Sequence, residues 1–143
     1  MNMTADVIIV GGAVMGSSIA YWLTRMQPGL EVLVLERDPS YAQASTALSV
    51  ASIRQQFTTA VNVRISRFGI EFIRNFAENL QGRGEVPSLG LQENGYLFLS
   101  STADGAAALA DVAAMQRAEG AVTELWSGDL QLKARFPGWK PAT

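Results

Sequence analysis

The chain contains no cysteine and no histidine among its 143 residues. Without cysteine, this stretch offers no disulfide, no thiolate metal ligand and no thiol nucleophile. Without histidine, it cannot assemble a Ser-His-Asp triad or a histidine metal cluster, and it lacks the commonest general base. We therefore expect no metal site and no catalysis of these kinds within these residues.

Charge and long apolar runs are also scarce. The formal net charge is −2, which supplies no attraction to a polyanion, so we expect neither nucleic acid nor an anionic membrane surface as a partner. The opening apolar run, Val7 to Val10, is far too short to span a membrane, and the residues before it lack a basic segment. These features predict a cytoplasmic protein with no membrane span.

What the sequence does contain is an ordinary globular composition, with 48% hydrophobic and 17% charged residues. Its first segment has a clear order of elements. Val7 to Val10 is a short β-branched run stopped by Gly11 and Gly12, the pattern of a strand buried on both faces of a parallel sheet. Apolar residues then recur at helical spacing from Val14 to Met26, and Glu31 to Glu36 forms a second strand. This order predicts an α/β fold that begins with a Rossmann-like βαβ unit.

A glycine-rich motif lies between the first strand and the helix, and it reads Gly11, Gly12, Ala13, Val14, Met15, Gly16. Gly11 permits the tight turn out of the strand, and Gly16 lets the helix approach the sheet. The start of the helix has unpaired N–H groups that attract an anion, and this attraction contributes roughly 0.3–1 kcal/mol at an exposed helix end. Glu36 closes the second strand about twenty residues later, where an acid binds a ribose diol and disfavours a 2′-phosphate. The motif predicts a dinucleotide site.

Ala13 departs from this fingerprint, because the second glycine normally gives the pyrophosphate room to approach the backbone. We expect the methyl group to be tolerated, since a small shift of the loop relieves most of the steric cost of about 1–3 kcal/mol. The alternative is that Gly11 to Gly16 merely turns a strand into a helix in a flavodoxin-like domain.

The middle of the chain is predicted to be a loop over residues 41–57 followed by a helix from Ala60 to Leu80. The apolar stripe of that helix comprises Val61, Ile65, Phe68, Phe72 and Phe76, and its solvated face comprises Arg67, Glu71, Arg74 and Glu78. Residues 81–84 break the chain. We expect them to separate the first part of a cofactor-binding domain, residues 1–83, from the start of an α+β substrate lobe, residues 84–143.

The last part of the chain is predicted to alternate between strands and helices. The expected strands are Leu89 to Gln92, Gly95 to Ser100 and Val122 to Leu125. An alanine-rich helix is expected from Asp104 to Glu119, capped by Thr102 or Asp104 and ended by Gly120. A final helix is expected from Gly128 to Phe136, where Pro137 ends it.

Several segments together resemble the family of D-amino acid oxidase, glycine oxidase and sarcosine oxidase. They are the run from Asp6 to Ser18, Leu35-Glu36-Arg37, Ser45 to Ser49, Ile53 to Phe57, Asn62 with Phe68 to Phe72, Asn94 to Leu99, and Leu132 to Pro137. The resemblance spans nearly the whole chain. It implies an FAD-dependent enzyme that oxidises the C–N bond of an amino acid or of a secondary or tertiary amine by hydride transfer to flavin.

The resemblance also implies roles for individual residues. The FAD-binding set would be Gly11, Gly12, Ala13, Val14, Met15 and Gly16 at the pyrophosphate, Glu36 and Arg37 at the adenosine, and Ser45, Thr46 and Ser49 at the phosphates or ribityl chain. Arg54 would lie near the isoalloxazine or a substrate carboxylate, whereas its alternative is a surface arginine. The alternative for the hydroxyl residues is that they cap a helical turn. Ala51 and Ser52 stand where many members have a glycine pair beside the flavin ring.

Members of this family are much longer than 143 residues, so we expect an N-terminal fragment that binds FAD poorly by itself and turns over no substrate. Three rival functions stay open at this point: the NAD-binding domain of a dehydrogenase, a non-catalytic flavin- or nucleotide-sensing module, and an inactive truncated nucleotide-binding fragment. A further βα repeat directly after Glu36 would favour NAD, but a serine-rich loop follows instead. The sequence does not select the substrate, the electron acceptor or the oligomeric state.

Overall fold

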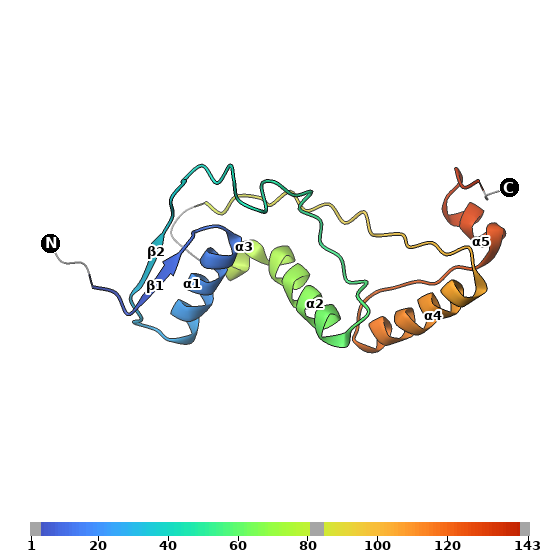
Figure 1. Cartoon of the computed structure of the whole chain (residues 1–143), viewed down its shortest axis with the longest axis horizontal. Helices are drawn as coiled ribbons and strands as arrows, with labels where there is room; N and C mark the ends of the chain where they lie inside the picture. The colour runs from blue at the N-terminus through green and yellow to red at the C-terminus, as the bar shows by residue number, and fades with distance from the viewer. Residues whose placement is uncertain (1–3, 81–84, 141–143) are drawn as a thin grey trace. The chain divides into compact units, whose positions relative to one another are not determined.

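The computed structural model describes residues 4–80 and 85–140, and the chain divides into two compact units between Ser52 and Ile53 (Figure 1). The lobe boundary predicted between residues 83 and 84 lies in the segment 81–84, outside the described residues, and stays a prediction. The two units are described separately below.

The first unit contains a parallel βαβ motif. Strand β1 (Val7–Val10) pairs with strand β2 (Val32–Leu35), with Val7 opposite Val32 and Val10 opposite Leu35. Helix α1 (Val14–Met26) connects them and contacts both strands (Figure 1). Parallel strands need such a crossover, and the β-branched runs favour the extended conformation. The predicted α/β fold class and βαβ unit are therefore confirmed.

The expectation that β1 is buried on both faces is wrong for the described residues. Burial alternates along the strand, with Val7 and Ile9 half-buried but Ile8 and Val10 exposed, Val10 by 85%. Ile9 faces helix α1, since its Cγ2 lies 3.2 Å from the position that a Cβ on Gly16 would take. One face of the strand is therefore covered by α1, and the other receives no comparable cover within the described chain.

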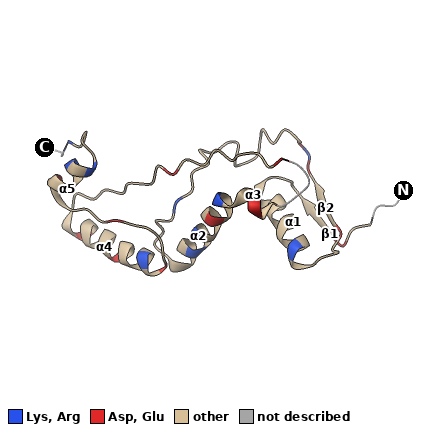
Figure 2. Ribbon diagram, turned by 180° about the vertical axis from the view of Figure 1, so that it is seen from behind, with Lys and Arg blue, Asp and Glu red and all other residues tan. Residues whose placement is uncertain are grey.

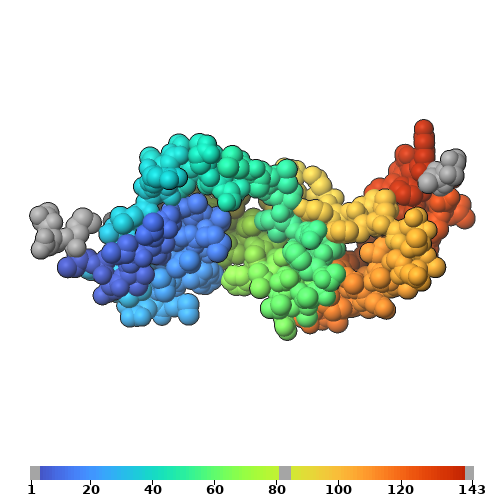
Figure 3. Space-filling model, viewed as in Figure 1, coloured from blue at the N-terminus to red at the C-terminus, as the bar shows by residue number. Residues whose placement is uncertain are grey.

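The predicted loop after β2 is confirmed, since residues 41–57 contain neither helix nor strand, with turns in the first half and irregular backbone in the second. A hydrogen bond from the Leu48 N–H to the Ala44 carbonyl closes one turn of the α type. In the space-filling view (Figure 3), the part of this loop that belongs to the first unit, coloured cyan, forms a ridge beside the blue residues of β1 and α1.

The second unit is helical, with α2 (Ala60–Arg74), α3 (Phe76–Asn79), α4 (Ala103–Ala118) and α5 (Gly128–Arg135). The single helix predicted from residue 60 to 80 is thus interrupted at Asn75. The Glu71 carbonyl accepts the Asn75 N–H at 3.1 Å and also the side-chain Nδ2 of Asn75 at 3.0 Å. Asparagine side chains that bond to nearby backbone groups in this way favour helix ends over helix interiors.

A small core joins α2 to α4 in this unit. Its buried apolar residues are Val63 and Ile70 of α2, Ala113 of α4, and Ala121. Gln116 is only 4% exposed, and its Nε2 donates to the Phe57 carbonyl at 3.0 Å, which satisfies the buried amide. The predicted apolar stripe is therefore not the main contact face, because Val61, Ile65 and Phe68 are exposed.

The boundaries of α4 follow the predicted signals within one residue. The Thr102 hydroxyl accepts a hydrogen bond from the Gly105 N–H, so Thr102 is the N-cap. At the other end, Gly120 has φ +79°, and the Ala121 N–H returns to the Gln116 carbonyl. Helix α5 likewise ends one residue before its predicted limit, ahead of Pro137.

The three strands predicted in the second half are wrong. The segments 89–92, 95–100 and 122–125 are irregular in the structure, and residues 85–100 run without any helix or strand (Figure 1). Their alternating apolar pattern favours an extended backbone, but a strand also needs a hydrogen-bonded neighbour. Within the described residues the ladder joins only β1 and β2, so these segments lack a partner.

The charged face predicted for the helix over residues 60–80 is confirmed, since Arg67, Glu71 and Arg74 of α2 and Glu78 of α3 are all exposed (Figure 2 colours the charges). Arg74 forms ion pairs with Glu71 at 3.4 Å and, more closely, with Glu93. Exposed pairs of this kind contribute at most about 1 kcal/mol each.

None of the helices in the described residues has the length and apolar character that crossing a bilayer requires.

Candidate cofactor site

The turn from β1 into α1 depends on two glycines. Gly11 has φ +103°, a left-handed backbone conformation that side chains disfavour. Gly16 lies against it: a Cβ on Gly16 would stand 1.8 Å from the Gly11 carbonyl oxygen and 3.2 Å from Ile9 Cγ2. The helix therefore approaches the strand as closely as the absence of a side chain allows, which brings its first turn beside the carboxyl end of β1.

The first turn of α1 has no side-chain cap among the described residues. Ala13 is the N-cap and its side chain makes no capping hydrogen bond, and the first turn carries no acidic residue. The first hydrogen bond of the helix runs from the Ser17 N–H to the Ala13 carbonyl. The N–H groups of Val14, Met15 and Gly16 therefore lack partners within the helix and favour an anion. This is the requirement that a diphosphate fulfils.

Glu36 points back to the glycine loop from the end of β2. Its Oε2 accepts from the Gly12 N–H at 2.7 Å, and its Oε1 accepts from the Asp38 N–H at 2.8 Å. These two bonds lower the pKa of the Glu36 carboxyl below its ordinary value of 4.5. The bond from the Asp38 N–H has the largest effect, and the bond from the Gly12 N–H has the second largest. The group is thus an ionised acceptor at neutral pH, and each oxygen keeps a lone pair for a ribose hydroxyl.

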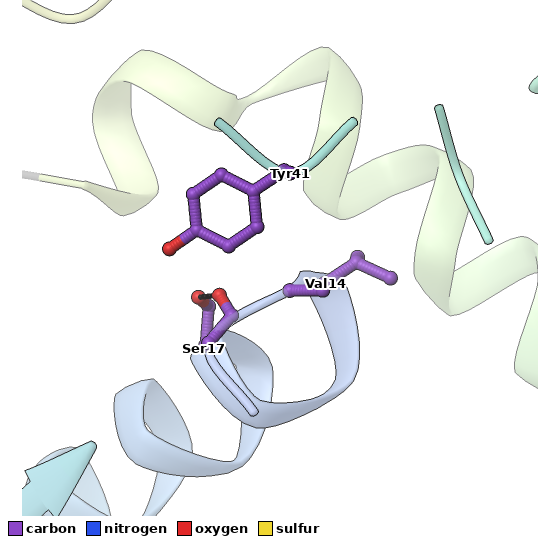
Figure 4. A pocket seen from close by; sticks show the side chains of 5 residues that line it. Val14, Ser17 and Tyr41 are labelled. Carbon is purple, nitrogen blue, oxygen red and sulfur yellow. Dashed lines mark hydrogen bonds between the residues drawn. The ribbon is translucent and has the colours of Figure 1, made fainter. Parts of the chain in front are cut away.

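A hollow lies over the glycine loop, and Figure 4 shows three of the side chains around it. It is lined by Gly12, Ala13, Val14, Ser17 and Tyr41. The Ser17 hydroxyl donates to the Gly12 carbonyl at 2.5 Å, which fastens the loop to the helix. Tyr41 covers the hollow from the loop after β2, and its hydroxyl oxygen lies 3.0 Å from the position of a Cβ on Gly12. The methyl group of Ala13 belongs to the wall of this hollow.

The predicted hydroxyl residues lie in the same unit but are not among those that line the hollow. Ser45, Thr46 and Ser49 belong to the turns after Tyr41. The Ser49 hydroxyl donates to the Thr46 carbonyl at 3.0 Å and accepts from the Ala51 N–H at 3.0 Å. For Ser49, these local bonds correspond to the alternative role as a turn cap. Arg37, next to Glu36, is in the first unit too.

Arg54 belongs to the second unit, so its place relative to the glycine loop is not defined. Within that unit its guanidinium carbon lies 4.9 Å from the centre of the Phe57 ring and 5.7 Å from that of Phe98. Cation–π contacts of this kind orient an arginine while its charge stays available. The side chain is exposed and held between two segments, 53–57 and 96–98, that are distant in sequence.

Two residues of the hollow were not predicted from the sequence. Ser17 carries a signal that was available, because a hydroxyl one residue after the last fingerprint glycine lies on the first turn of the helix. Tyr41 carries none. Its position depends on a backbone φ of +56°, and no sequence pattern around an aromatic residue indicates such a conformation.

A parallel βαβ unit with a glycine turn, an uncapped helix start and an acid at the end of β2 is typical of dinucleotide-binding families. Comparison with known families identifies which one. The family model described as "FAD dependent oxidoreductase" (DAO) matches residues 6–143, so the chain belongs to the DAO family of FAD-dependent oxidoreductases. No solved structure matches this chain.

Three similar curated proteins have the same description, "FAD-dependent oxidoreductase domain-containing protein 1". The one from Bos taurus is 50% identical over 138 residues, that from Xenopus laevis 46% over 138, and that from Mus musculus 43% over 139. Each alignment covers 93% of this chain but only 28%, 27% and 28% of the relative, respectively. The chain thus spans slightly more than a quarter of their length.

Proposed function

We propose that this chain is the FAD-binding N-terminal portion of a flavin-dependent oxidoreductase. The diphosphate would be held at the start of α1 by the segment from Gly11 to Gly16, and the adenosine ribose by Glu36. The observation that carries the proposal is the combination of an uncapped, acid-free helix start with a carboxylate fixed to the adjoining Gly12 N–H at 2.7 Å. One part favours an anion and the other accepts from a diol, which are the two groups that the adenosine diphosphate part of FAD presents.

For the whole protein we propose oxidation of the C–N bond of an amino acid or of a secondary or tertiary amine. FAD held by the segment from Gly11 to Gly16 and by Glu36 would supply the hydride acceptor for this oxidation, whose imine or iminium product hydrolyses in water. Arg54 would contribute its charge at the flavin ring or a substrate carboxylate. Support for this role is limited to the exposed guanidinium that Phe57 and Phe98 hold in place.

The remaining cofactor contacts are proposed on the family pattern. Arg37 would lie at the adenine side, and Ser45, Thr46 and Ser49 would meet the phosphates or ribityl chain. An enzyme of this kind needs neither nucleic acid nor metal, and the cytoplasmic location also stays a prediction. Fractionation of cells that express the whole protein would test the location.

Titration of the isotope-labelled chain with FAD, NAD and ADP, followed by NMR of the backbone amides, tests the proposal even where binding is weak. We expect FAD and ADP to shift the amides of Val14, Met15 and Gly16, with FAD bound more tightly than NAD. Glu36→Gln should lower the affinity for ADP, because a carboxylate acceptor becomes an amide. Glu31→Gln is the matched control in the same unit, with the same loss of charge.

A preference for NAD would overturn the assignment in favour of the rival dehydrogenase domain. Absence of any shift at millimolar FAD would favour the inert fragment instead. The proposal also expects no turnover of sarcosine, glycine or D-amino acids by the chain alone, because it spans only about 28% of the relatives' length.

A further inference from the structure

We propose that Tyr41 is a cofactor-binding residue whose hydroxyl donates a hydrogen bond to the dinucleotide diphosphate over the glycine loop. The inference rests on the proposed function, because it names a further contact at the same site. Neither the glycine fingerprint nor the family pattern described above includes this tyrosine.

The first support is the place of the phenol. Tyr41 lines the hollow with four residues of the turn and first helical turn, Gly12, Ala13, Val14 and Ser17. Figure 4 shows its ring above the start of α1, with the hydroxyl directed toward the Ser17 side. An anion bound to the N–H groups of this helix start therefore has the Tyr41 hydroxyl as its opposite wall.

The second support is the inventory of donors around the hollow. The Gly12 N–H is already bonded to Glu36, and the single hydroxyl proton of Ser17 is donated to the Gly12 carbonyl. Alanine, valine and glycine side chains have no donor. The Tyr41 hydroxyl makes no hydrogen bond with any residue in the described ranges 4–80 and 85–140, so its proton is available to a phosphate oxygen.

The third support is that the backbone holds the ring there at a cost. Tyr41 has φ +56°, a left-handed conformation that is rare for an aromatic residue. Two turn bonds fix it, from the Tyr41 N–H to the Asp38 carbonyl and from the Ala44 N–H to the Tyr41 carbonyl. The Asp38 N–H in turn donates to Glu36. The same turn thus orients the ribose acceptor and the phenol, and such outliers concentrate at ligand sites.

The test compares the affinities of the full 143-residue chain for FAD, ADP and adenosine, measured by amide shifts, with those of three variants. Tyr41→Phe removes only the hydroxyl. Tyr41→Asn removes the ring as well, but asparagine tolerates the left-handed backbone. The role of the hydroxyl can therefore still be tested with Tyr41→Asn if Tyr41→Phe is unstable. Tyr96→Phe is the matched control, since Tyr96 is 41% exposed against 40% for Tyr41 and belongs to the other unit.

We expect Tyr41→Phe and Tyr41→Asn to weaken FAD and ADP about tenfold or more, which is the usual effect of losing a hydrogen bond to a charged group. Adenosine should bind each variant as it binds the unaltered chain, and Tyr96→Phe should change nothing. An affinity of Tyr41→Phe for FAD within twofold of the original overturns the inference, as does an equal loss for adenosine. If the unaltered chain ignores FAD and ADP, the proposed function itself fails, which is a distinct result.

Discussion

The Gly11 carbonyl oxygen lies 1.8 Å from the place where a side chain on Gly16 would begin. The first and third glycines of the motif are therefore coupled: one turns the chain out of β1, and the other lets α1 pass beneath that turn. This contact sets the distance between the helix start and the sheet edge, and the cofactor site is built on it.

Gly16→Ala is expected to lower the free energy of unfolding by about 3 kcal/mol, because the added methyl group meets backbone atoms that cannot move separately. Gly69→Ala is the control, since a Cβ at this position of α2 would have no atom within 4 Å. It should raise stability by about 0.5–1 kcal/mol through helix propensity. Urea unfolding of both variants measures the difference, and equal effects would contradict the close-packing role of Gly16.

Glu36 should make stability depend on pH on the acid side of neutrality. Its pKa is lowered in the folded chain, so its stabilising contribution is complete above the ordinary value of 4.5 and is lost as the pH falls from there through the folded value. The free energy of unfolding of the original chain should therefore decline in this range more steeply than that of Glu36→Gln.

The pKa of the Asp38 carboxyl is also lowered, but from an ordinary value of 3.8. The main cause is the hydrogen bond from the Ser40 hydroxyl, and the second is the bond from the Ser40 N–H. The contribution of Asp38 is consequently lost over a lower pH range, so between pH 4.5 and 3.8 Asp38→Asn should reduce the decline in the free energy of unfolding less than Glu36→Gln does. Parallel pH profiles for the original chain and Glu36→Gln would show that the bonds from Gly12 and Asp38 do not form in solution.

Ala51→Gly is expected to stabilise the chain. Ala51 has φ +48°, and a residue with a Cβ in this left-handed conformation destabilises the folded chain by about 1–2 kcal/mol. Glycine avoids this penalty, but it raises the conformational entropy of the unfolded chain, which lowers stability by about 0.4–1 kcal/mol. The net gain is about 1 kcal/mol in thermal or urea unfolding. Ala47→Gly, in the same loop but without a positive φ, should destabilise by about 0.5 kcal/mol instead. A loss of stability in Ala51→Gly would contradict the left-handed conformation.

The cap of α4 offers a fourth test. Thr102→Ala should lower stability by about 1 kcal/mol, because the Gly105 N–H loses its acceptor. Thr59 is the N-cap of α2 but makes no capping bond through its side chain, so Thr59→Ala should change stability much less. Thr102→Ser should recover most of the loss. Equal effects at Thr59 and Thr102 would argue against the bond.

These details show which parts of the fold the sequence could predict. The βαβ unit was predictable because its information is local: β-branched runs, two glycines and helical spacing between Val14 and Met26 each act within a few residues. The ends of α4 were predictable for the same reason, since Thr102 and Gly120 act on adjacent backbone groups. The family resemblance, confirmed over residues 6–143, added the cofactor.

The failures have the opposite character. Strands near Tyr96 and Val122 depend on a hydrogen-bonded neighbour, which no periodicity within the segment supplies. The break at Asn75 accompanies a side-chain hydrogen bond to the Glu71 carbonyl, and the burial of Val63 and Ile70 in place of the predicted stripe depends on where α4 packs. Tyr41 reaches the hollow only through a turn that is tied to Glu36, so its part in the site becomes visible only in three dimensions.

The uncapped start of α1 also affects how the chain should be handled. Because the N-cap alanine makes no capping hydrogen bond, the N–H groups of the first turn can bind an anion from the solution. Sulfate or inorganic phosphate in the storage buffer would compete with the nucleotide for these donors and would also raise the melting temperature. A preparation in such a buffer would therefore combine a high melting temperature with a low apparent affinity for FAD. Chloride-based buffers with an organic cation suit this molecule best.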